Sequence, residues 1–353
     1  MATITQPGET TTAKPCKKKL LRRTDRDHSQ QLRLASQLSF LLLNLWIGIQ
    51  FYRWVRFYEM GGSSAAISRP AGVEGWLPIA GLMNLKYLLM TGSMPAIHPA
   101  SLVLLASFLA ISLLLRKAFC SWLCPIGTVS EYLWKLGRRI LSRNFSLPRW
   151  LDVALRSLKY VLLGFFAWAV LNMSALDIDA FQRSPYGLIV DVRMLNFFRF
   201  LGMTAAVVIA ILAILSLLIQ SFWCRYLCPY GALLGLASLG SPTRISRHAD
   251  PCIDCGKCAK ACPSSLAVDT LVTIRSAECT GCLECVAACP AEGALHLELP
   301  RKIRVPAWAV AAGIAIIFFG AVTAAKVTHH WNTNIPDYVL YQLVPTANVQ
   351  SHP

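Results

Sequence analysis

The sequence predicts an α-helical multi-pass membrane protein, with about five transmembrane helices and one small α+β domain on the cytoplasmic side. Three observations lead to this fold class. Hydrophobic residues make up 55% of the 353 residues and charged residues only 15%, which is more apolar surface than a soluble protein can bury. Long apolar runs recur along the chain, and lysines and arginines concentrate in alternate segments between them. Eight closely spaced cysteines mark the small domain.

Five apolar runs are predicted to be membrane-spanning helices. A helix needs about 20 residues to cross the hydrocarbon layer, because each residue adds about 1.5 Å. The third run is the shortest, and its Lys159 is expected to snorkel to the membrane surface. A further stretch, 76–90, contains Pro78, Gly81 and Lys86 and predicts an interfacial or re-entrant helix. The predicted spans are 34–51, 97–115, 158–173, 201–220 and 305–325.

The distribution of positive charge predicts the orientation. With the N-terminus inside, segments 1–33, 116–157 and 221–304 contain 25 lysines and arginines, whereas the opposing segments contain 8. Cytoplasmic loops of membrane proteins carry such an excess. The clustered cysteines are therefore expected in the cytoplasm and the C-terminus outside. The same distribution explains the net charge of +16, so no nucleic-acid partner is expected.

These features divide the chain into five parts. Residues 1–33 form a basic tail that is predicted to be disordered, and its Cys16 is interpreted as an ordinary thiol. No small-residue cleavage site follows the first apolar run, so this run is predicted to be an uncleaved span. The other parts are a four-helix membrane domain at 34–240, a cysteine-rich domain at 241–300, a fifth span at 301–325 and an outer tail at 326–353.

The cysteine-rich domain contains the spacing C-x2-C-x2-C-x3-C-P twice. This spacing is typical of bacterial-type ferredoxins with two [4Fe–4S] clusters, in which each motif gives three ligands to one cluster and its fourth to the other. The predicted ligands of cluster 1 are Cys252, Cys255, Cys258 and Cys289. The predicted ligands of cluster 2 are Cys279, Cys282, Cys285 and Cys262.

Zinc is the alternative metal for these eight cysteines. Zinc sites usually use two C-x2-C pairs separated by a dozen or more residues, and the tighter pattern here favours iron–sulfur clusters. The β-like segments 243–247, 271–275 and 294–299 fit a small ferredoxin fold. The domain is therefore predicted to be an α+β bacterial-type 2[4Fe–4S] ferredoxin.

A second cysteine pattern, aromatic-C-x3-C-P-x-G, occurs once after the second span and once after the fourth. Cys120 and Cys124 precede Pro125, and Cys224 and Cys228 precede Pro229. Two similar helix-pair units are therefore expected, and a pseudo-twofold axis could relate them. At i and i+4 of a helical turn both sulfurs share one face, and the following helix would favour thiolate at the preceding cysteine.

Three interpretations of these four cysteines remain open from the residues alone. They could share a third cluster or a metal ion, form a reversible dithiol pair, or serve only in helix packing. The surrounding aromatic side chains are expected to be interface anchors. They are Phe119, Trp122, Trp223, Tyr226 and Tyr230.

Together, the two C-x3-C-P segments and the double ferredoxin motif resemble the membrane polyferredoxins related to the quinol-dehydrogenase membrane component of periplasmic nitrate reductase. The same core occurs in nitrous-oxide-reductase maturation regulators and in accessory proteins of cytochrome oxidase assembly. The resemblance covers about residues 34–300 and rests chiefly on twelve cysteines. The segment 69–78 is also similar to the outer loop of this family. No flavin-binding domain is expected before the first span and no folded outer domain after the fifth, so the bare quinol-dehydrogenase core is expected to be the nearest pattern.

The resemblance implies an electron-transfer protein of a bacterial inner membrane, with membrane lipid, quinol or quinone and a redox protein as partners. The alternative is a maturation or assembly factor that reduces a metal ion such as copper, or that regulates a neighbouring oxidoreductase. A third possibility is a membrane anchor for a soluble redox subunit. No catalytic residue is assigned.

Other redox and transport functions are not favoured. The spans contain no histidine pair for haem and no buried Asp, Glu or Arg, which argues against a proton pump or a transporter. His98, His329 and His330 lie at the outer ends of predicted spans. They are interpreted as interfacial polar residues.

Overall fold

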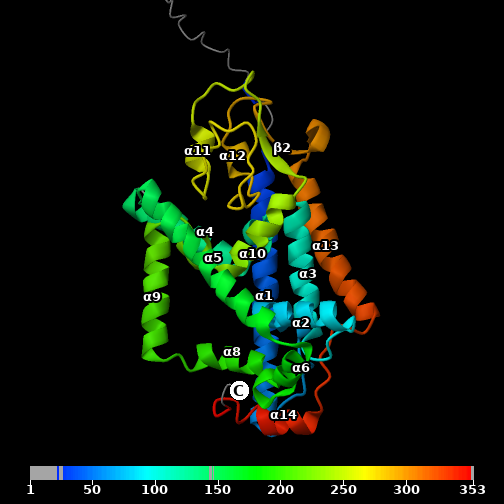
Figure 1. The fold of residues 1–353 in the computed structure, drawn as a ribbon. Helices are drawn as coiled ribbons and strands as arrows, with labels where there is room; N and C mark the ends of the chain where they lie inside the picture. The colour runs from blue at the N-terminus through cyan, green and yellow to red at the C-terminus, as the bar shows by residue number, and fades with distance from the viewer. Residues whose placement is uncertain (1–21, 24–26, 143–144, 146, 351–353) are drawn as a thin grey trace, which may run out of the picture.

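The computed structural model describes residues 22–23, 27–142, 145 and 147–350. Long helices form one end of the molecule, and the cysteine-rich domain, with α11, α12 and β2, forms the other (Figure 1). The C-terminus lies at the end opposite to the cysteine-rich domain, beside α8 and α14. Cys16, which is interpreted as an ordinary thiol, and most of the predicted basic tail fall outside the described residues.

Three helices are long and apolar enough to cross a membrane. They are α1 (Ser29–Glu59), α5 (Arg149–Asn172) and α13 (Ala307–Val327), and they contain the first, third and fifth predicted spans. Large apolar side chains such as Trp46, Trp168 and Phe319 are exposed on them. Such exposure suits a lipid environment and would be unfavourable in water.

The other two predicted spans are less regular. The second is α3 (Pro99–Leu114), whose 16 residues reach only about 24 Å at 1.5 Å per residue, short of the roughly 30 Å hydrocarbon core. The fourth corresponds to α9 (Met203–Leu218), another 16-residue helix, which is bent by 81° relative to the preceding α8 (Val190–Arg199). The described chain therefore contains three candidate spans, or four if the bent pair is one span. The number of five membrane spans therefore stays a prediction.

Helix α1 begins at Ser29, so the predicted disorder of residues 1–33 is wrong for residues 29–33. The backbone N–H of Ser29 donates to the Asp27 carboxylate at 2.7 Å, which supports the start of the helix. Arg33 and Gln37 are buried in the first turns. They contact elements more than 80 residues away, which no local pattern could indicate.

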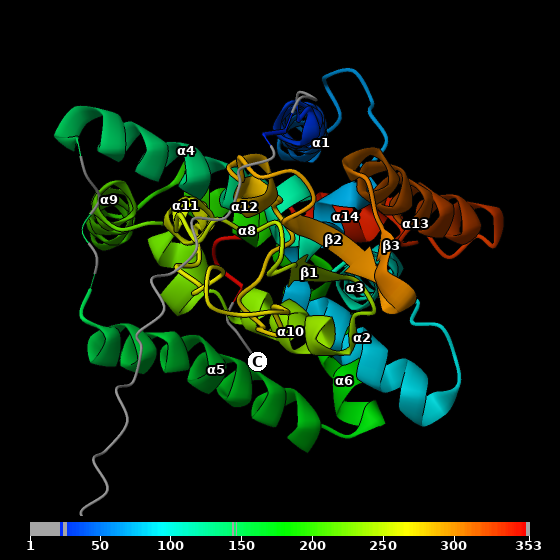
Figure 2. The same cartoon turned by 90° about the horizontal axis from the view of Figure 1, so that it is seen from above.

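Helix α2 (Pro78–Thr91) corresponds to the stretch predicted as interfacial or re-entrant. It packs against α3 and runs across it rather than along it (Figures 1 and 2). Gly92 ends it with a φ of 69°, a left-handed conformation that glycine adopts without strain.

Four short helices lie at this end of the molecule. They are η1 (Ala71–Trp76) between α1 and α3, α6 (Ala175–Arg183) and α7 (Pro185–Leu188) between α5 and α8, and α14 (Asp337–Leu343) after α13.

Helices α4 (Pro125–Leu141) and α10 (Pro229–Ala237) follow the two C-x3-C-P motifs. Each repeat thus consists of a 16-residue helix, a five-residue π-helical turn and a second helix that starts with proline. The turns are η2 (Phe119–Leu123) and η3 (Trp223–Leu227). The predicted repeat of helix pairs is therefore present in the structure.

The cysteine-rich domain has a small antiparallel sheet in the order β1-β2-β3. β1 (Arg244–Arg247) pairs with β2 (Leu295–Leu299), and β2 pairs with β3 (Ile303–Arg304). The predicted strand 271–275 forms only an isolated bridge to β1, between Thr273 and Ser246. The helical pieces of this part are α11 (Lys257–Ala261), α12 (Glu284–Ala287), η4 (Ser238–Gly240) and η5 (Pro300–Lys302).

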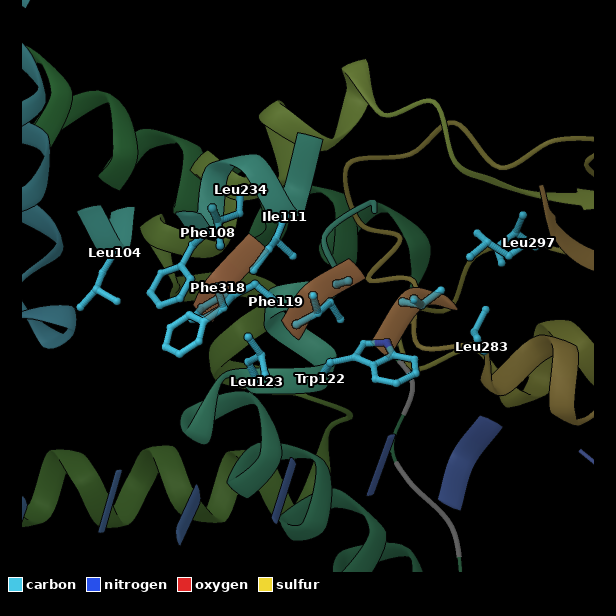
Figure 3. Close-up of a cluster of buried hydrophobic side chains, with 14 of the residues drawn as sticks. Leu104, Phe108, Ile111, Phe119, Trp122, Leu123, Leu234, Leu283, Leu297 and Phe318 are labelled. Carbon is cyan, nitrogen blue, oxygen red and sulfur yellow. The ribbon is translucent and has the colours of Figure 1, made fainter. Parts of the chain in front are cut away.

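One hydrophobic core joins the two ends of the molecule. It extends from Phe108 on α3 and Phe318 on α13, through Trp122 of the first motif, to Leu283 and Leu297 of the cysteine-rich domain (Figure 3). Phe108 stacks on Phe119 with 3.9 Å between the ring centroids. The cysteine-rich domain is therefore packed on the helices and not merely tethered to them.

Candidate functional site

The four cysteines predicted for cluster 2 surround one small cavity. Cys262, Cys279, Cys282 and Cys285 all line it, together with apolar side chains such as Ile245 and Ile274. Cys262 comes from the first motif and the other three from the second, as the spacing predicts. Burial raises the pKa of the Cys282 thiol to about 12, although Arg33 lowers it. A set of four thiols around an enclosed space suits a buried cluster.

The cysteines predicted for cluster 1 also gather across the two motifs. Burial raises the pKa of the Cys289 thiol, and the nearby sulfurs of Cys252 and Cys255 raise it further. Burial likewise raises the pKa of Cys258, with Cys289 as a further cause. Cys289 thus lies among the first-motif cysteines. Cys255 is exposed, so this site is nearer to solvent than the other.

Among the residues that the structure describes, no group of three or more Cys, His, Asp or Glu side chains is placed to hold a single metal ion.

Each C-x3-C-P motif folds as a π-helical turn and not as the α-turn that the i, i+4 spacing suggests. The N–H of Cys124 donates to the carbonyl of Phe119 at 2.9 Å, and that of Cys228 to Trp223 at 3.0 Å. Both bonds join residues i and i+5, which defines a π-turn, and such turns are frequent at functional sites.

The second cysteine of each motif caps the following helix. Gly127 N–H donates to the sulfur of Cys124 at 3.4 Å, and Gly231 N–H to that of Cys228 at 3.2 Å. Each of these sulfurs therefore lies at the N-terminus of the following helix, as predicted. Burial nevertheless raises the pKa of Cys124 to about 12 and that of Cys120 to about 11. The helix N-terminus alone does not make these thiols reactive.

All four C-x3-C-P cysteines line one large cavity of about 620 Å³. The two motifs that repeat in the sequence therefore lie around the same cavity. The cavity also reaches Cys282, Thr280 and Pro263 in the cysteine-rich domain. Its remaining walls come mainly from α1, α3 and α13, and from the segment around η1.

The wall of this cavity changes in character along its length. Near the cysteines it carries charged side chains, namely Arg33, Lys117, Glu131, Arg225 and Glu278. Further away it is mainly apolar and includes Phe40, Leu43, Leu104, Phe108 and Phe319, with Lys326 as a charged exception. Leu43 on α1 and Phe319 on α13 are also exposed on the outside of the molecule. The cavity therefore reaches the apolar surface between these helices.

Lys159 does not snorkel to the membrane surface as predicted. Its ammonium group is fully buried and donates to both oxygens of Glu278, at 2.7 and 2.6 Å. Tyr160 donates to the same carboxylate at 3.1 Å. Glu278 directly precedes Cys279, so helix α5 is tied to the second ferredoxin motif. A partner 119 residues away outweighs the local preference for the interface.

The first C-x3-C-P motif is bonded to the ligand loop of cluster 2. Ser121 donates to Thr280 O at 2.7 Å, and the Trp122 indole donates to Gly281 O at 3.2 Å. The Arg116 guanidinium donates to Ser276 O at 3.0 Å. The second ferredoxin motif therefore lies nearest to the C-x3-C-P cysteines.

The aromatic residues around the motifs are mostly not interface anchors, which corrects that expectation. Phe119, Trp122 and Tyr226 are buried, because they pack into the core or bond to polar groups deep in the protein. Tyr226 donates to Asp152 at 2.6 Å. Phe119, Trp223 and Tyr230 line the large cavity.

An ion-pair network that sequence reasoning missed lies beside Cys282. Arg33 of α1 bonds Glu131 of α4 and Glu284 of α12, each at 2.7 Å. Gln30 of α1 donates to Cys282 O at 3.0 Å. The only signals in the sequence are that Arg33 directly precedes an apolar run and that Glu284 directly precedes the predicted ligand Cys285, and such charged residues are common in loops.

His98 is buried, with 1% of its surface exposed, so its interpretation as an interfacial residue is wrong. Its two ring nitrogens lie 3.3 Å from the Glu74 carboxylate and 2.9 Å from Gly187 O. Arg69 joins Glu74 to Asp191 in the same network. His329 is exposed and His330 half-buried, in keeping with the expectation for an outer surface.

Comparison with known proteins agrees with this geometry. Segments 97–144 and 200–246 match the family model described as a 4Fe-4S binding domain, and each contains one C-x3-C-P motif. Residues 244–290 match the model described as a 4Fe-4S dicluster domain. No solved structure matches the chain significantly.

Several curated proteins are similar to the chain. YccM of Escherichia coli K12, named as a candidate electron transport protein, is 47% identical over 326 residues, which is 91% of each chain. The regulatory protein NosR of Pseudomonas aeruginosa is 31% identical over 46% of this chain and 22% of its own length. The ferredoxin-type protein NapH of Escherichia coli is 28% identical over 42% of this chain and 48% of its own.

Proposed function

This chain belongs to the family of YccM-like ferredoxin-type proteins with 4Fe-4S domains, and from that premise we propose that it relays electrons between the quinone pool of a membrane and a redox partner protein. The relative YccM is named for electron transport and NapH as a ferredoxin-type protein, and both names support the electron-transfer role.

The cavity of about 620 Å³ carries this proposal. Its volume falls within the range of about 300–1,000 Å³ typical of small-molecule sites. A quinol combines a polar ring with a long apolar tail. The charged and cysteine-lined end suits the ring, and the apolar section that reaches the surface between α1 and α13 suits the tail.

The eight ferredoxin cysteines are proposed to hold two [4Fe–4S] clusters in the ligand sets derived from the spacing. When bound, such clusters supply one-electron redox chemistry over a wide range of potentials. The chain positions the ligands by the core around Ile245 and Leu283 and by the bonds from Ser121 and Trp122 to the second motif. Cys282 lines both the small cavity and the large one, so the quinol site adjoins the ligands of cluster 2.

Of the three interpretations of the C-x3-C-P cysteines, we propose a third metal centre, most simply a [4Fe–4S] cluster. Four thiols line one cavity, and both motifs lie in segments matched by a 4Fe-4S binding domain model. The raised pKa values of Cys120 and Cys124 make these thiols poor nucleophiles, which weighs against dithiol exchange. A bound metal would supply the charge needed to keep them as thiolates.

The protein is further proposed to lie in a bacterial inner membrane with its ferredoxin domain in the cytoplasm. The charge distribution supports this orientation. The short helix α3 and the bent α8–α9 pair would then complete the five predicted spans within a bundle, where neighbouring helices and not lipid surround α3.

Blocking the apolar part of the cavity provides the test. A Cβ on Gly75 would lie 3.1 Å from Leu104, so Gly75→Leu should fill the cavity and slow reduction of the clusters by a quinol analogue about tenfold or more. Gly48 is exposed on α1 with nothing within 4 Å of its Cβ position, so Gly48→Leu is the matched control. Reduction by dithionite should be equal in both variants. Clusters that quinol does not reduce and quinone does not oxidise in the natural protein would contradict the proposal.

Iron counting tests the third centre separately. Replacing Cys120, Cys124, Cys224 and Cys228 by alanine should remove about four iron atoms per chain and leave about eight. Cys16→Ala is the control, because Cys16 belongs to neither motif. Full iron content in the quadruple variant, with loss of copper reduction, would favour a maturation factor instead.

A further inference from the structure

A buried arginine joins the membrane helices to the second ferredoxin motif. The Arg33 side chain is only 4% exposed. Its two terminal nitrogens bond both oxygens of Glu131 on α4 at 2.7 Å, and one of them also bonds Glu284 on α12 at 2.7 Å. Charge-assisted pairs with this fork geometry are strong and fix orientation.

Lys135 completes the network and balances its charge. Its ammonium donates to Glu131 at 2.5 Å and to Glu284 at 3.3 Å. Burial would raise the pKa of Glu131, but Arg33 and Lys135 outweigh it and lower the pKa. The network thus contains two cations and two carboxylates, with no net charge.

The network lies against the ligand loop of cluster 2. Arg33 Nε donates to Gln30 at 2.9 Å, and Gln30 donates to Cys282 O at 3.0 Å. Glu284 stands two residues after Cys282 and one before Cys285. Arg33 and Cys282 also line the same large cavity. A change of charge at Arg33 would therefore change the electrostatic potential at Cys282, because the path between them is short and poorly hydrated.

We propose that Arg33 is a positioning residue that keeps the charge beside Cys282 balanced and thereby raises the reduction potential of cluster 2. Reduction adds one negative charge to the site. Without Arg33, two carboxylates would face one lysine, and this net negative charge would disfavour the added electron, strongly so in a medium of low dielectric constant. The inference rests on the proposed function and on the ligand set of cluster 2.

Two substitutions at one ion pair test the inference, because they predict shifts of opposite sign. In the full-length protein, purified anaerobically and titrated with EPR detection, Arg33→Gln should lower the midpoint potential of one cluster. Glu284→Gln removes a negative charge from the same pair and should raise the potential of that cluster. We expect each shift to reach about a tenfold change in the one-electron equilibrium, which corresponds to about 59 mV. A merely loosened structure would move both variants in the same direction.

Two further variants serve as controls. Arg183→Gln removes the same charge from an exposed pair with Asp179 at the opposite end of the molecule and should leave both potentials unchanged. Arg33→Lys keeps the charge and should restore most of the potential lost in Arg33→Gln.

The inference is overturned if Arg33→Gln and Glu284→Gln retain their iron and shift the potential in the same direction, or not at all. If Arg33→Gln does not assemble its clusters, Glu284→Gln decides alone, since an unchanged or lower potential refutes the role. Absence of iron from the natural protein would instead refute the proposed function.

Discussion

At the residue scale, Glu74 holds together three segments at the end of the molecule opposite to the ferredoxin domain. Its fully buried carboxylate accepts bonds from Arg69 at 2.8 Å, Thr333 at 2.8 Å and the Ser101 N–H at 3.1 Å. His98 lies 3.3 Å away. A buried carboxylate is tolerated only when it is paired and bonded in this way.

This network predicts a loss of stability in acid. Burial raises the pKa of Glu74, but Arg69 and His98 outweigh it and lower the pKa to about 2 from 4.5. Because the unfolded chain then binds more protons, the contribution of Glu74 is complete above about pH 4.5 and is lost as the pH falls towards 2. Its size is about 3 kcal/mol. Thermal unfolding in detergent should show this fall, and the difference between the natural protein and Glu74→Gln should vanish near pH 2; a constant difference from pH 7 to 2 would contradict the assignment.

The same scale shows what residue-level prediction can and cannot reach. The eight ferredoxin cysteines follow a local spacing from which their proposed ligand sets derive, and in the structure Cys262 of the first motif lines one cavity with three cysteines of the second. Lys159 and Arg33 behave otherwise, because their partners Glu278 and Glu131 are separated from them by 119 and 98 residues. Sequence patterns describe neighbours along a helix and carry no information about such pairs.

At the element scale, a glycine allows α4 to pack closely against the π-turn of the first C-x3-C-P motif. A Cβ on Gly127 would lie 2.3 Å from the carbonyl oxygen of Cys120. The start of α4 can therefore pack this closely against the π-turn only because residue 127 has no side chain. This contact explains why a glycine stands three residues after the second cysteine in the first repeat.

The equivalent glycine of the second repeat provides a matched comparison. A Cβ on Gly231 would lie 3.5 Å from the sulfur of Cys228 and 3.6 Å from Lys117 Nζ, which is ordinary contact. We therefore expect Gly127→Ala to destabilise the protein by about 1–3 kcal/mol and to lower its iron content, while Gly231→Ala retains both. Thermal unfolding and iron analysis of the two variants measure the difference. Equal behaviour of the two alanine variants would show that the turn can relax.

The two repeats were predictable from their sequence identity, whereas the π-turns were not. Cysteines at i and i+4 fit an α-turn equally well, and only the bonds from Cys124 to Phe119 and from Cys228 to Trp223 distinguish the two. The helix expected after Pro125 is α4, which runs to Leu141. Its apolar side chains Ile126, Val129 and Leu136 fall on one exposed face.

At the scale of the whole molecule, the ferredoxin domain is built into the fold. The core runs without interruption from Phe318 to Leu297, and Arg33 and Lys159 add buried ion pairs across the junction. Such a junction holds the large cavity and the ligand loop of cluster 2 at a fixed separation, which a relay of electrons requires. The sequence predicted both parts but not their packing, because contacts between distant segments leave no periodic signal.

The path of α13 gives the last prediction, which concerns orientation. This helix of 21 residues links the ferredoxin domain at one end of the molecule to the C-terminal segment at the other (Figure 1), and its length of about 31 Å matches one crossing of the hydrocarbon core. With the positively charged segments in the cytoplasm, a fluorescent protein fused after residue 304 should fluoresce. Alkaline phosphatase fused after residue 353 should be active, because this enzyme requires export. Phosphatase activity only at the fusion before α13 would place the ferredoxin domain outside, where electrons from its clusters could reach only an external partner.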